Sequence, residues 1–246
     1  MSGKDRMKNI QSKMQAVARL LYPPRCVICD EVLANAKRGV CRKCRGEISY
    51  VGGEVCKRCG KPLREERGSF CRDCENNPHF FIGGRALYTY ESVALPIYRF
   101  KYAGRREYGI FFAREIAYYL GGYIRQIAPD AILPVPLHPG KERARGYNQA
   151  GVIAKELGRL LDIPVYSNLV KRVANTKPLK NMGPLERQNS LKKAFILGEN
   201  GVKLDTTIVI DDVFTTGSTI DAISKVLLQE KSMKIYFITL AIGEGI

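Results

Sequence analysis

The stretch "TTIVIDDVFTTGSTI", Thr206 to Ile220, joins an apolar run to two aspartates and then to a segment rich in hydroxyls. The run Ile208–Ile210 is typical of a buried strand, and helical periodicity resumes at Ser218. Asp211 and Asp212 therefore stand where a strand is expected to end. Because ligands bind at the carboxyl ends of strands in parallel sheets, we expect these carboxylates to line a ligand site.

The loop Thr215–Thr219 predicts a phosphate site. It offers backbone N–H groups, hydroxyls and a glycine that permits close approach, at the start of a helix whose dipole favours an anion. Two carboxylates beside such a loop suit a ligand with vicinal hydroxyls, or one with Mg²⁺ next to its phosphate, and a ribose 5-phosphate is such a ligand. The alternative, a turn with a capping hydroxyl, leaves the adjacent acids unaccounted for.

From about residue 78 onward, strand-like and helix-like segments alternate. Strands are expected at 83–91, 131–137, 194–197, 206–210 and 234–242, and helices within 92–109 and at 110–126, 147–161 and 218–230. This alternation predicts an α/β fold with a mostly parallel sheet covered on both faces.

Eight cysteines form four Cys-x-x-Cys pairs: Cys26/Cys29, Cys41/Cys44, Cys56/Cys59 and Cys71/Cys74. Eleven residues separate each pair from the next. Two such pairs close a tetrahedral four-sulfur Zn²⁺ site, so the spacing predicts a tandem zinc ribbon with two structural Zn²⁺ ions. Sequential pairing needs the shortest loops, and crossed pairing stays open. A redox role would need a βαβ context that this region lacks. His79 follows the last pair and is expected to have no metal role.

The charge of the chain is strongly positive. Forty Lys and Arg residues against 24 Asp and Glu give a net charge of +16 and a pI near 9.6. Such a surface attracts phosphates, either of nucleic acid or of small ligands. The cations around the cysteine pairs have two interpretations: they contact a nucleic-acid backbone, or they balance the negative charge of the tetrathiolate sites.

The segment "IYRFKYAGRREYG", residues 97–109, alternates aromatic and basic side chains. Stacking aromatics beside cations are typical of proteins that bind single-stranded nucleic acid without sequence preference. The alternative is that the aromatic side chains belong to the core. The basic residues proposed for DNA contacts are Arg99, Lys101, Arg105, Arg106, Lys177 and Lys180.

The first 24 residues are expected to form an amphipathic helix that ends at Pro23 and Pro24. They lack the continuous apolar core of a secretory signal, and no apolar run in the chain is long enough to span a bilayer. We therefore expect a cytoplasmic protein in three parts: the helix, residues 1–24; the double zinc ribbon, residues 25–77; and the α/β domain, residues 78–246.

The motif "VIDDVFTTGST" resembles the phosphoribosyl-pyrophosphate (PRPP) loop of the type I phosphoribosyltransferases. Together with "LPVPLHPGKERARGYNQA", residues 133–150, and the cysteine pairs, it makes the whole chain similar to the ComF family of competence proteins, ComFC type. In that family a double zinc ribbon precedes a phosphoribosyltransferase-like domain. The resemblance therefore implies a parallel sheet of the type I phosphoribosyltransferase kind.

The resemblance also implies roles for individual residues. Asp211 and Asp212 would be the catalytic residues and would hold the ribose hydroxyls, with Mg²⁺ nearby. The loop 175–187 would close over PRPP. The remaining PRPP-binding residues would be Thr215, Thr216, Gly217, Ser218 and Thr219 around the 5-phosphate, and Pro136, His138 and Arg145 on the pyrophosphate side.

Two functions are compatible with these features. The first is a DNA-uptake protein for natural transformation that binds single-stranded DNA and has a PRPP/Mg²⁺ pocket; the resemblance implies a helicase-like ComFA protein as a partner. The second is a catalytically active phosphoribosyltransferase that acts on an unknown base, in nucleotide salvage or regulation. No motif marks a base-binding element, so the sequence leaves open whether the protein is an enzyme.

Overall fold

The computed structural model describes residues 23–35, 39–63, 68–174, 194–198, 202–229 and 232–243. The chain forms two compact units, residues 1–48 and 49–246. The first four cysteines belong to the first unit, and the other four belong to the unit that contains the sheet. The expected N-terminal helix, the closing loop 175–187, and with it Lys177 and Lys180, lie outside the described residues.

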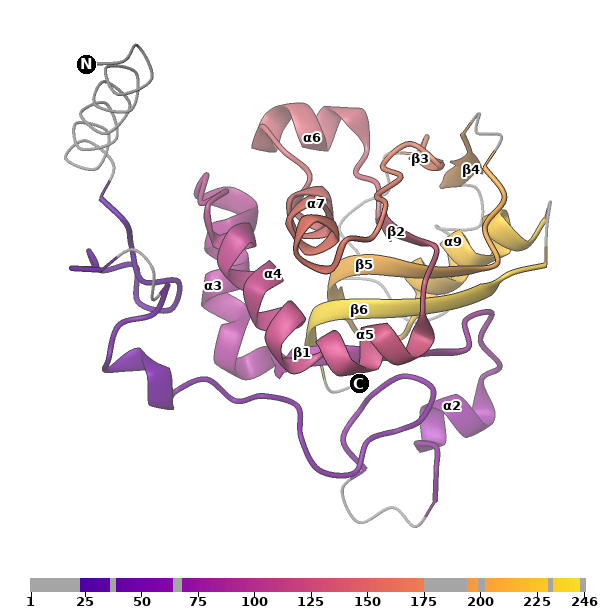
Figure 1. The fold of residues 1–246 in the computed structure, drawn as a ribbon, viewed down its shortest axis with the longest axis horizontal. Coiled ribbons are helices and arrows are strands. Elements are labelled where there is room, and N and C mark those ends of the chain that lie inside the picture. Colours follow the sequence, from indigo (N-terminus) through magenta and orange to yellow (C-terminus); the bar gives the residue numbers. More distant parts are fainter. Residues whose placement is uncertain are drawn as a thin grey trace, which may run out of the picture. The chain divides into compact units, whose positions relative to one another are not determined.

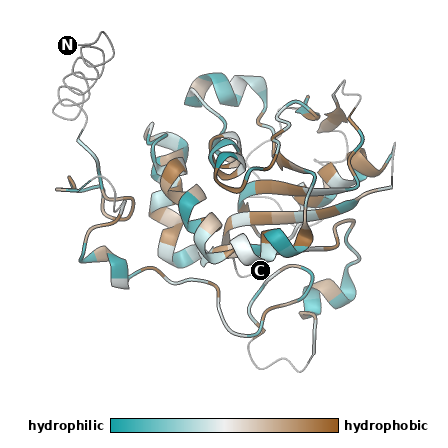
Figure 2. Cartoon of the chain, viewed as in Figure 1, coloured by the Kyte–Doolittle hydropathy of each residue, from teal (hydrophilic) through white to brown (hydrophobic). Residues whose placement is uncertain are grey.

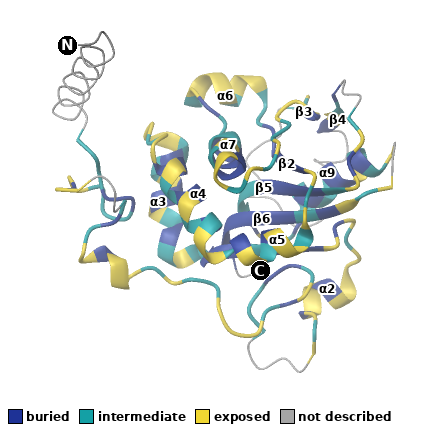
Figure 3. Cartoon of the chain, in the orientation of Figure 1, coloured by how far each residue is buried: buried dark blue, intermediate teal, exposed yellow. Residues whose placement is uncertain are grey.

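The second unit is built on a four-stranded parallel sheet (Figure 1). Its strands lie in the order β1 (Gly83–Thr89), β6 (Lys234–Ile242), β5 (Thr206–Phe214) and β2 (Ala131–Pro134). The central strands are buried on both faces, as Figure 3 shows for β5 and β6. Figure 2 shows the same strands as mostly hydrophobic, with some polar positions, which is typical of a parallel sheet covered on both sides. The predicted α/β class with a mostly parallel sheet is confirmed.

Helices cover the two faces of this sheet. They are α3 (Tyr90–Tyr102), α4 (Tyr108–Tyr119), α5 (Gly121–Ile127), α7 (Gln149–Leu161) and α9 (Ser218–Leu228). Helices α4 and α7 pack together, α7 lies over β5 and β2, and α9 lies behind the strands in Figure 1. The apolar residues of α9 that face inward, Ile220, Ile223 and Leu227, recur at helical spacing. The helix expected at 110–126 is interrupted at Leu120, just before two glycines, and forms α4 and α5.

Several short elements carry no clear periodicity and were not predicted. They are η2 (Cys44–Gly46), α2 (Arg72–Asn76), α6 (Pro139–Arg145) and β3 (Val170–Arg172). The expected strand at 194–197 exists as β4 (Phe195–Leu197), but it pairs antiparallel with β3 outside the main sheet. None of the helices in the described part of the chain is long and apolar enough to cross a membrane.

The edge strand β1 is covered by the segment that contains the second group of cysteines. The amide of Val51 donates to Leu87 O at 3.0 Å, and the amide of Thr89 donates to Ser49 O at 3.0 Å. Gly60 lies so close to this strand that a Cβ there would be 2.8 Å from the carbonyl oxygen of Gly84. The cysteine-bearing loop therefore protects an edge that would otherwise be open to pairing with another chain.

Candidate functional site

The eight cysteines form two clusters of four, and in each cluster the thiol sulfurs lie within 4.8 Å of one another. Sequential pairs share a cluster: Cys26, Cys29, Cys41 and Cys44 form the first, and Cys56, Cys59, Cys71 and Cys74 the second. In a tetrahedral site with Zn–S bonds of about 2.3 Å, neighbouring sulfurs lie about 3.8 Å apart. The observed sulfur distances of 4.0 Å between Cys29 and Cys41 and 3.6 Å between Cys59 and Cys71 fit this geometry. Each cluster therefore fits one structural Zn²⁺ ion.

Backbone amides favour the thiolate form of one sulfur in each cluster. The amide of Cys44 donates to Cys41 Sγ at 3.4 Å and helps to lower the pKa of Cys41 to about 7. Burial raises the pKa of Cys56, but amide donors that include Cys59 N outweigh it and lower the pKa to about 7. Because zinc binds the deprotonated sulfur, these amides prepare one ligand in each site for the metal.

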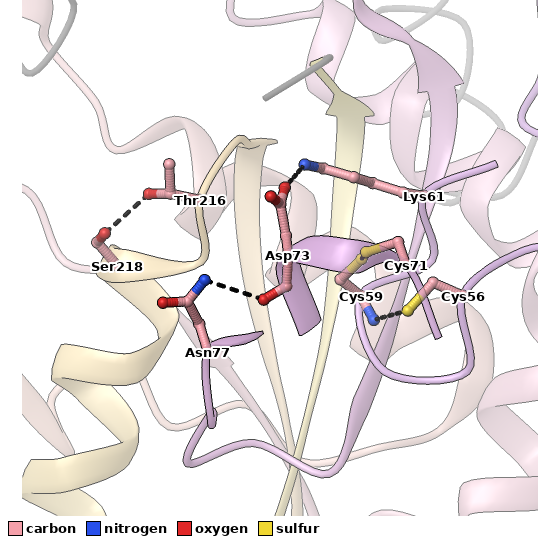
Figure 4. A network of polar contacts seen from close by, with 8 residues as sticks. All are labelled: Cys56, Cys59, Lys61, Cys71, Asp73, Asn77, Thr216 and Ser218. Carbon is pink, nitrogen blue, oxygen red and sulfur yellow. Dashed lines mark hydrogen bonds and ion pairs between the residues drawn. The ribbon is translucent and has the colours of Figure 1, made fainter. Parts of the chain in front are cut away.

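Basic side chains near the second cluster are used within the structure. Lys61 forms an ion pair with Asp73, as Figure 4 shows, and its side chain is 13% exposed. Burial lowers the pKa of Lys61, but Asp73 and the thiols of the cluster raise it more strongly. Arg58 donates to Cys74 O at 3.1 Å and lies over the ring of Phe70. For these two cations the geometry favours charge balance and packing over contacts with nucleic acid.

Asp211 and Asp212 lie within β5, and the prediction that the strand ends at Ile210 is wrong. The strand continues to Phe214 because β6 pairs with it along this whole length. On the other side β2 ends at Pro134, opposite Ile210. The two aspartates therefore project beyond the end of β2, at the carboxyl edge of the sheet.

The two carboxylates have different environments. Asp212 forms an ion pair with Lys101 of α3, with 2.7 Å between Nζ and Oδ1. Burial raises the pKa of Asp211 to about 7, and the charge of Asp212 adds to this shift. The amide of Asp212 donates to Asp211 Oδ1 at 2.8 Å. This hydrogen bond and the charge of Lys101 both lower the pKa of Asp211 and so oppose the upward shift. A carboxylate with such a raised pKa favours the arrival of a cation, and pKa shifts of this kind are concentrated at functional sites.

Three cations, Lys141, Arg145 and Arg172, are linked to Asp211 through the charge of Arg172. Burial lowers the pKa of Arg172 on β3, and the charge of Asp211 opposes that shift. Burial also lowers the pKa of Lys141 on α6, and the charges of Arg172 and Arg145 add to it. Lys141 therefore interacts electrostatically with both Arg172 and Arg145, and Arg172 interacts with Asp211. The sequence prediction included Arg145 but missed Lys141 and Arg172. Lys141 lies in the block 133–150 but was given no role, and Arg172 belongs to no motif.

The loop after β5 turns into α9 at a glycine in the left-handed conformation. Gly217 has a φ of 78° and immediately precedes α9. None of the described side chains caps this helix; instead, the hydroxyls of Thr216 and Ser218 bond to each other at 2.8 Å (Figure 4). Thr215 is exposed and Thr219 is half-buried. The first amides of α9 are therefore not occupied by a side-chain cap.

The segment after β2 lies at the same edge of the sheet. Pro136 is buried, and His138 caps α6 by accepting a hydrogen bond from Gly140 N to its Nδ1 at 3.2 Å. Asn148 Nδ2 donates to Val135 O at 2.9 Å, which ties the start of α7 to the end of β2. His138 therefore has a structural partner in this segment.

The aromatic side chains of 97–109 divide between core and surface. Phe100 and Tyr108 are buried, whereas Tyr98 is 57% and Tyr102 61% exposed. The rings of Tyr98 and Tyr102 lie 5.1 Å apart on one face of α3. Arg145 extends this surface, because its guanidinium lies 4.7 Å from the centre of the Tyr102 ring.

The basic DNA-contact candidates in this region have different environments. Lys101 points to Asp212, so it belongs to the carboxylate site. Arg99 and Arg105 are half-buried, and Arg106 is exposed.

The chain is similar to several known proteins. A model of the double zinc ribbon domain matches residues 17–75. Competence protein F of Haemophilus influenzae is 33% identical over 213 residues, which cover 82% of this chain and 90% of that protein. Competence protein ComFC of Bacillus subtilis is 28% identical, covering 83% and 89%. The DNA utilization protein YhgH of Escherichia coli is 29% identical, covering 85% and 93%. A solved hypoxanthine phosphoribosyltransferase from Staphylococcus aureus is 12% identical, with a TM-score of 0.34, covering 55% of this chain and 62% of its own.

Proposed function

The chain belongs to the ComF family of competence proteins, and we propose on this premise that it serves DNA uptake by binding single-stranded DNA and by holding PRPP with Mg²⁺. The names of its relatives, competence proteins and DNA utilization proteins, support the DNA-uptake role. The site at the carboxyl edge of the sheet supports the phosphoribosyl ligand.

The observation that carries the PRPP proposal is the combination of two adjacent carboxylates with a group of cations and an uncapped helix. Asp211 and Asp212 would bind the ribose hydroxyls and Mg²⁺, which takes oxygen ligands. The amides that follow Gly217 would bind the 5-phosphate. Arg145 and Arg172 would face the pyrophosphate, with Mg²⁺ neutralising its charge.

Calorimetric titration tests this ligand. We expect PRPP to bind in the presence of Mg²⁺ and to bind much more weakly without it. The double variant Asp211→Asn/Asp212→Asn should lose this binding while it keeps its far-UV circular dichroism, because the carboxylates lie at the sheet edge. An unchanged affinity in the folded double variant would refute the assignment.

The same cations favour a second candidate, a catalytic phosphoribosyl transfer. Lys141, Arg145 and Arg172 could stabilise a departing pyrophosphate, which is the main electrostatic demand of such a reaction. The measurement is pyrophosphate release from PRPP in the presence of each free nucleobase in turn. If PRPP binds but no base causes release of pyrophosphate, the transferase activity is excluded and the DNA-uptake role stands alone.

The exposed pair Tyr98 and Tyr102 supports the DNA ligand. Stacking of a base on an aromatic ring contributes about 1–3 kcal/mol and does not depend on base identity. The net charge of +16 adds attraction to the DNA backbone. Because Lys101 reaches Asp212 from the same helix, a strand stacked on these tyrosines would pass beside the PRPP site.

Fluorescence anisotropy with a labelled single-stranded oligonucleotide tests this surface. A footprint of four to six phosphates should give a slope of log affinity against log salt of roughly −3 to −4. Tyr98→Ala and Tyr102→Ala should each weaken binding by about tenfold without changing the slope. Tyr118→Ala is the matched control, because this tyrosine of α4 is 80% exposed but lies outside the pair. Equal effects of all three substitutions would exclude a stacking surface on α3.

A further inference from the structure

A histidine between the second cysteine cluster and β1 is bound to the helix that follows the phosphate loop. His79 Nδ1 lies 2.7 Å from Asp221 Oδ2, and the amide of Phe80 donates to Asp221 Oδ1 at 2.9 Å. Asp221 lies in the first turn of α9. Both oxygens of one carboxylate therefore bind the segment that leaves the zinc ribbon.

The same histidine ring lies against the glycine of the loop. A Cβ at Gly217 would be 3.2 Å from His79 Cε1 and 3.1 Å from the Phe214 ring. The His79 ring also stacks on the ring of Phe81, with 4.5 Å between the ring centres. The His79 side chain is 6% exposed. The ring thus forms part of the wall that holds the backbone of the loop.

The position of His79 also depends on the cysteine cluster. Helix α2 carries Cys74 and begins directly after Cys71, and both thiols are buried. The end of this helix is closed by Asn77, whose amide and side chain both donate to Asp73 O (Figure 4). Two residues, Asn77 and Pro78, connect the helix to His79. A shift of the metal-bound segment would therefore move the ring that supports Gly217.

We propose that His79 is a positioning residue, which couples metal occupancy of the second cysteine cluster to the shape of the phosphate loop. This inference rests on the proposed function, because it takes the loop Thr215–Thr219 to bind the phosphate of PRPP. Loss of the metal from the second cluster loosens the loop and weakens PRPP binding. Loss of the metal from the first cluster has no such effect, since that cluster belongs to the other compact unit.

The full-length, zinc-loaded protein allows two independent measurements. Hydrogen–deuterium exchange reports on the loop amides without any ligand, and calorimetry reports PRPP affinity with Mg²⁺. His79→Phe keeps an aromatic ring but loses the bond to Asp221, and His79→Asn restores a donor at a similar position. Lys225→Ala is the control. It removes another contact between this segment and α9, because the Lys225 ammonium lies 4.6 Å from the Phe80 ring centre. Lys225 is one helical turn beyond Asp221 and about two turns from the loop.

We expect His79→Phe to accelerate exchange over residues 215–221 and to weaken PRPP binding about fivefold or more. His79→Asn should recover part of both effects, and Lys225→Ala should change neither. Unchanged loop exchange in His79→Phe would overturn the inference, as would a loss of protection spread evenly over the sheet. If wild type fails to bind PRPP, the proposed function fails, while the exchange data still decide the coupling.

Cysteine variants test the metal side. Cys71→Ser, which removes a ligand of the second cluster, should accelerate loop exchange, whereas Cys41→Ser in the first cluster should not. Equal behaviour of the two variants would overturn the inference. If Cys71→Ser also unfolds the sheet, as exchange in β5 and β6 would reveal, the His79 variants decide the result.

Discussion

Replacing Asp211 by asparagine should stabilise the ligand-free protein at neutral pH. The substitution removes a charge but keeps the Oδ1 acceptor for the amide of Asp212, which donates to it at 2.8 Å. Burial, with the adjacent charge of Asp212, raises the pKa of Asp211 from 3.8 to about 7. The folded protein therefore has an ionised carboxyl group in an unfavourable place at any pH above that value.

The direction and size of this change in stability follow from proton linkage. Between about pH 4 and pH 7 the folded state holds a proton that the unfolded state has released, so unfolding becomes easier as the pH rises, by at most about 1.4 kcal/mol per pH unit. Above about pH 7 both states have released the proton, and the loss of stability caused by the ionised Asp211 is constant. The full shift corresponds to about 4 kcal/mol. Because Asp211 is partly exposed and water screens its charge, we expect a gain of about 2 kcal/mol at pH 8.

Urea unfolding followed by far-UV circular dichroism measures this effect in a chain without tryptophan. Between about pH 5.5 and pH 8.5 the advantage of Asp211→Asn over wild type should grow and then become constant. Asp212→Asn is the matched control, and we expect no gain from it because it removes the partner of Lys101, 2.7 Å away. The reasoning is refuted if Asp211→Asn gives no gain at pH 8, or a gain that does not shrink in acid.

Three further outcomes are expected. Metal analysis should give two zinc ions per chain, reduced to one in Cys41→Ser and in Cys71→Ser. Thermal unfolding should show that Cys71→Ser destabilises the sheet and Cys41→Ser does not, because the second cluster packs on β1. Gly60→Ala should lower the free energy of unfolding by about 2 kcal/mol more than Gly53→Ala. Both glycines have a positive φ, +76° at Gly60 and +73° at Gly53. Only at Gly60 would an added Cβ meet the backbone, because it would lie 2.8 Å from Gly84 O. If urea unfolding shows equal losses of stability in the two glycine variants, the contact between Gly60 and Gly84 does not account for the effect.

Local patterns determined the elements that depend on neighbours in the sequence. The apolar run Ile208–Ile210 predicted a buried strand, and the resumed periodicity after Gly217 predicted α9. The cysteine spacing predicted four-sulfur sites. The two cysteines of each Cys-x-x-Cys pair are so close in sequence that backbone geometry alone brings their thiols together, and two such pairs complete one site. Residue-to-residue spacing carries this information because helices, strands and knuckles are set by short-range sterics and hydrogen bonds.

Contacts between distant segments were decided by the tertiary structure. The strand containing Asp211 is longer than its sequence suggests because β6 pairs with it, and Lys101 reaches Asp212 across 111 positions of sequence. His79 and Asp221 are 142 positions apart, and no periodicity links them. Arg172 lies on a three-residue strand, too short for a pattern. Such pairs form where packed elements bring side chains together, and packing depends on the whole set of buried surfaces at once, which no local stretch of sequence contains.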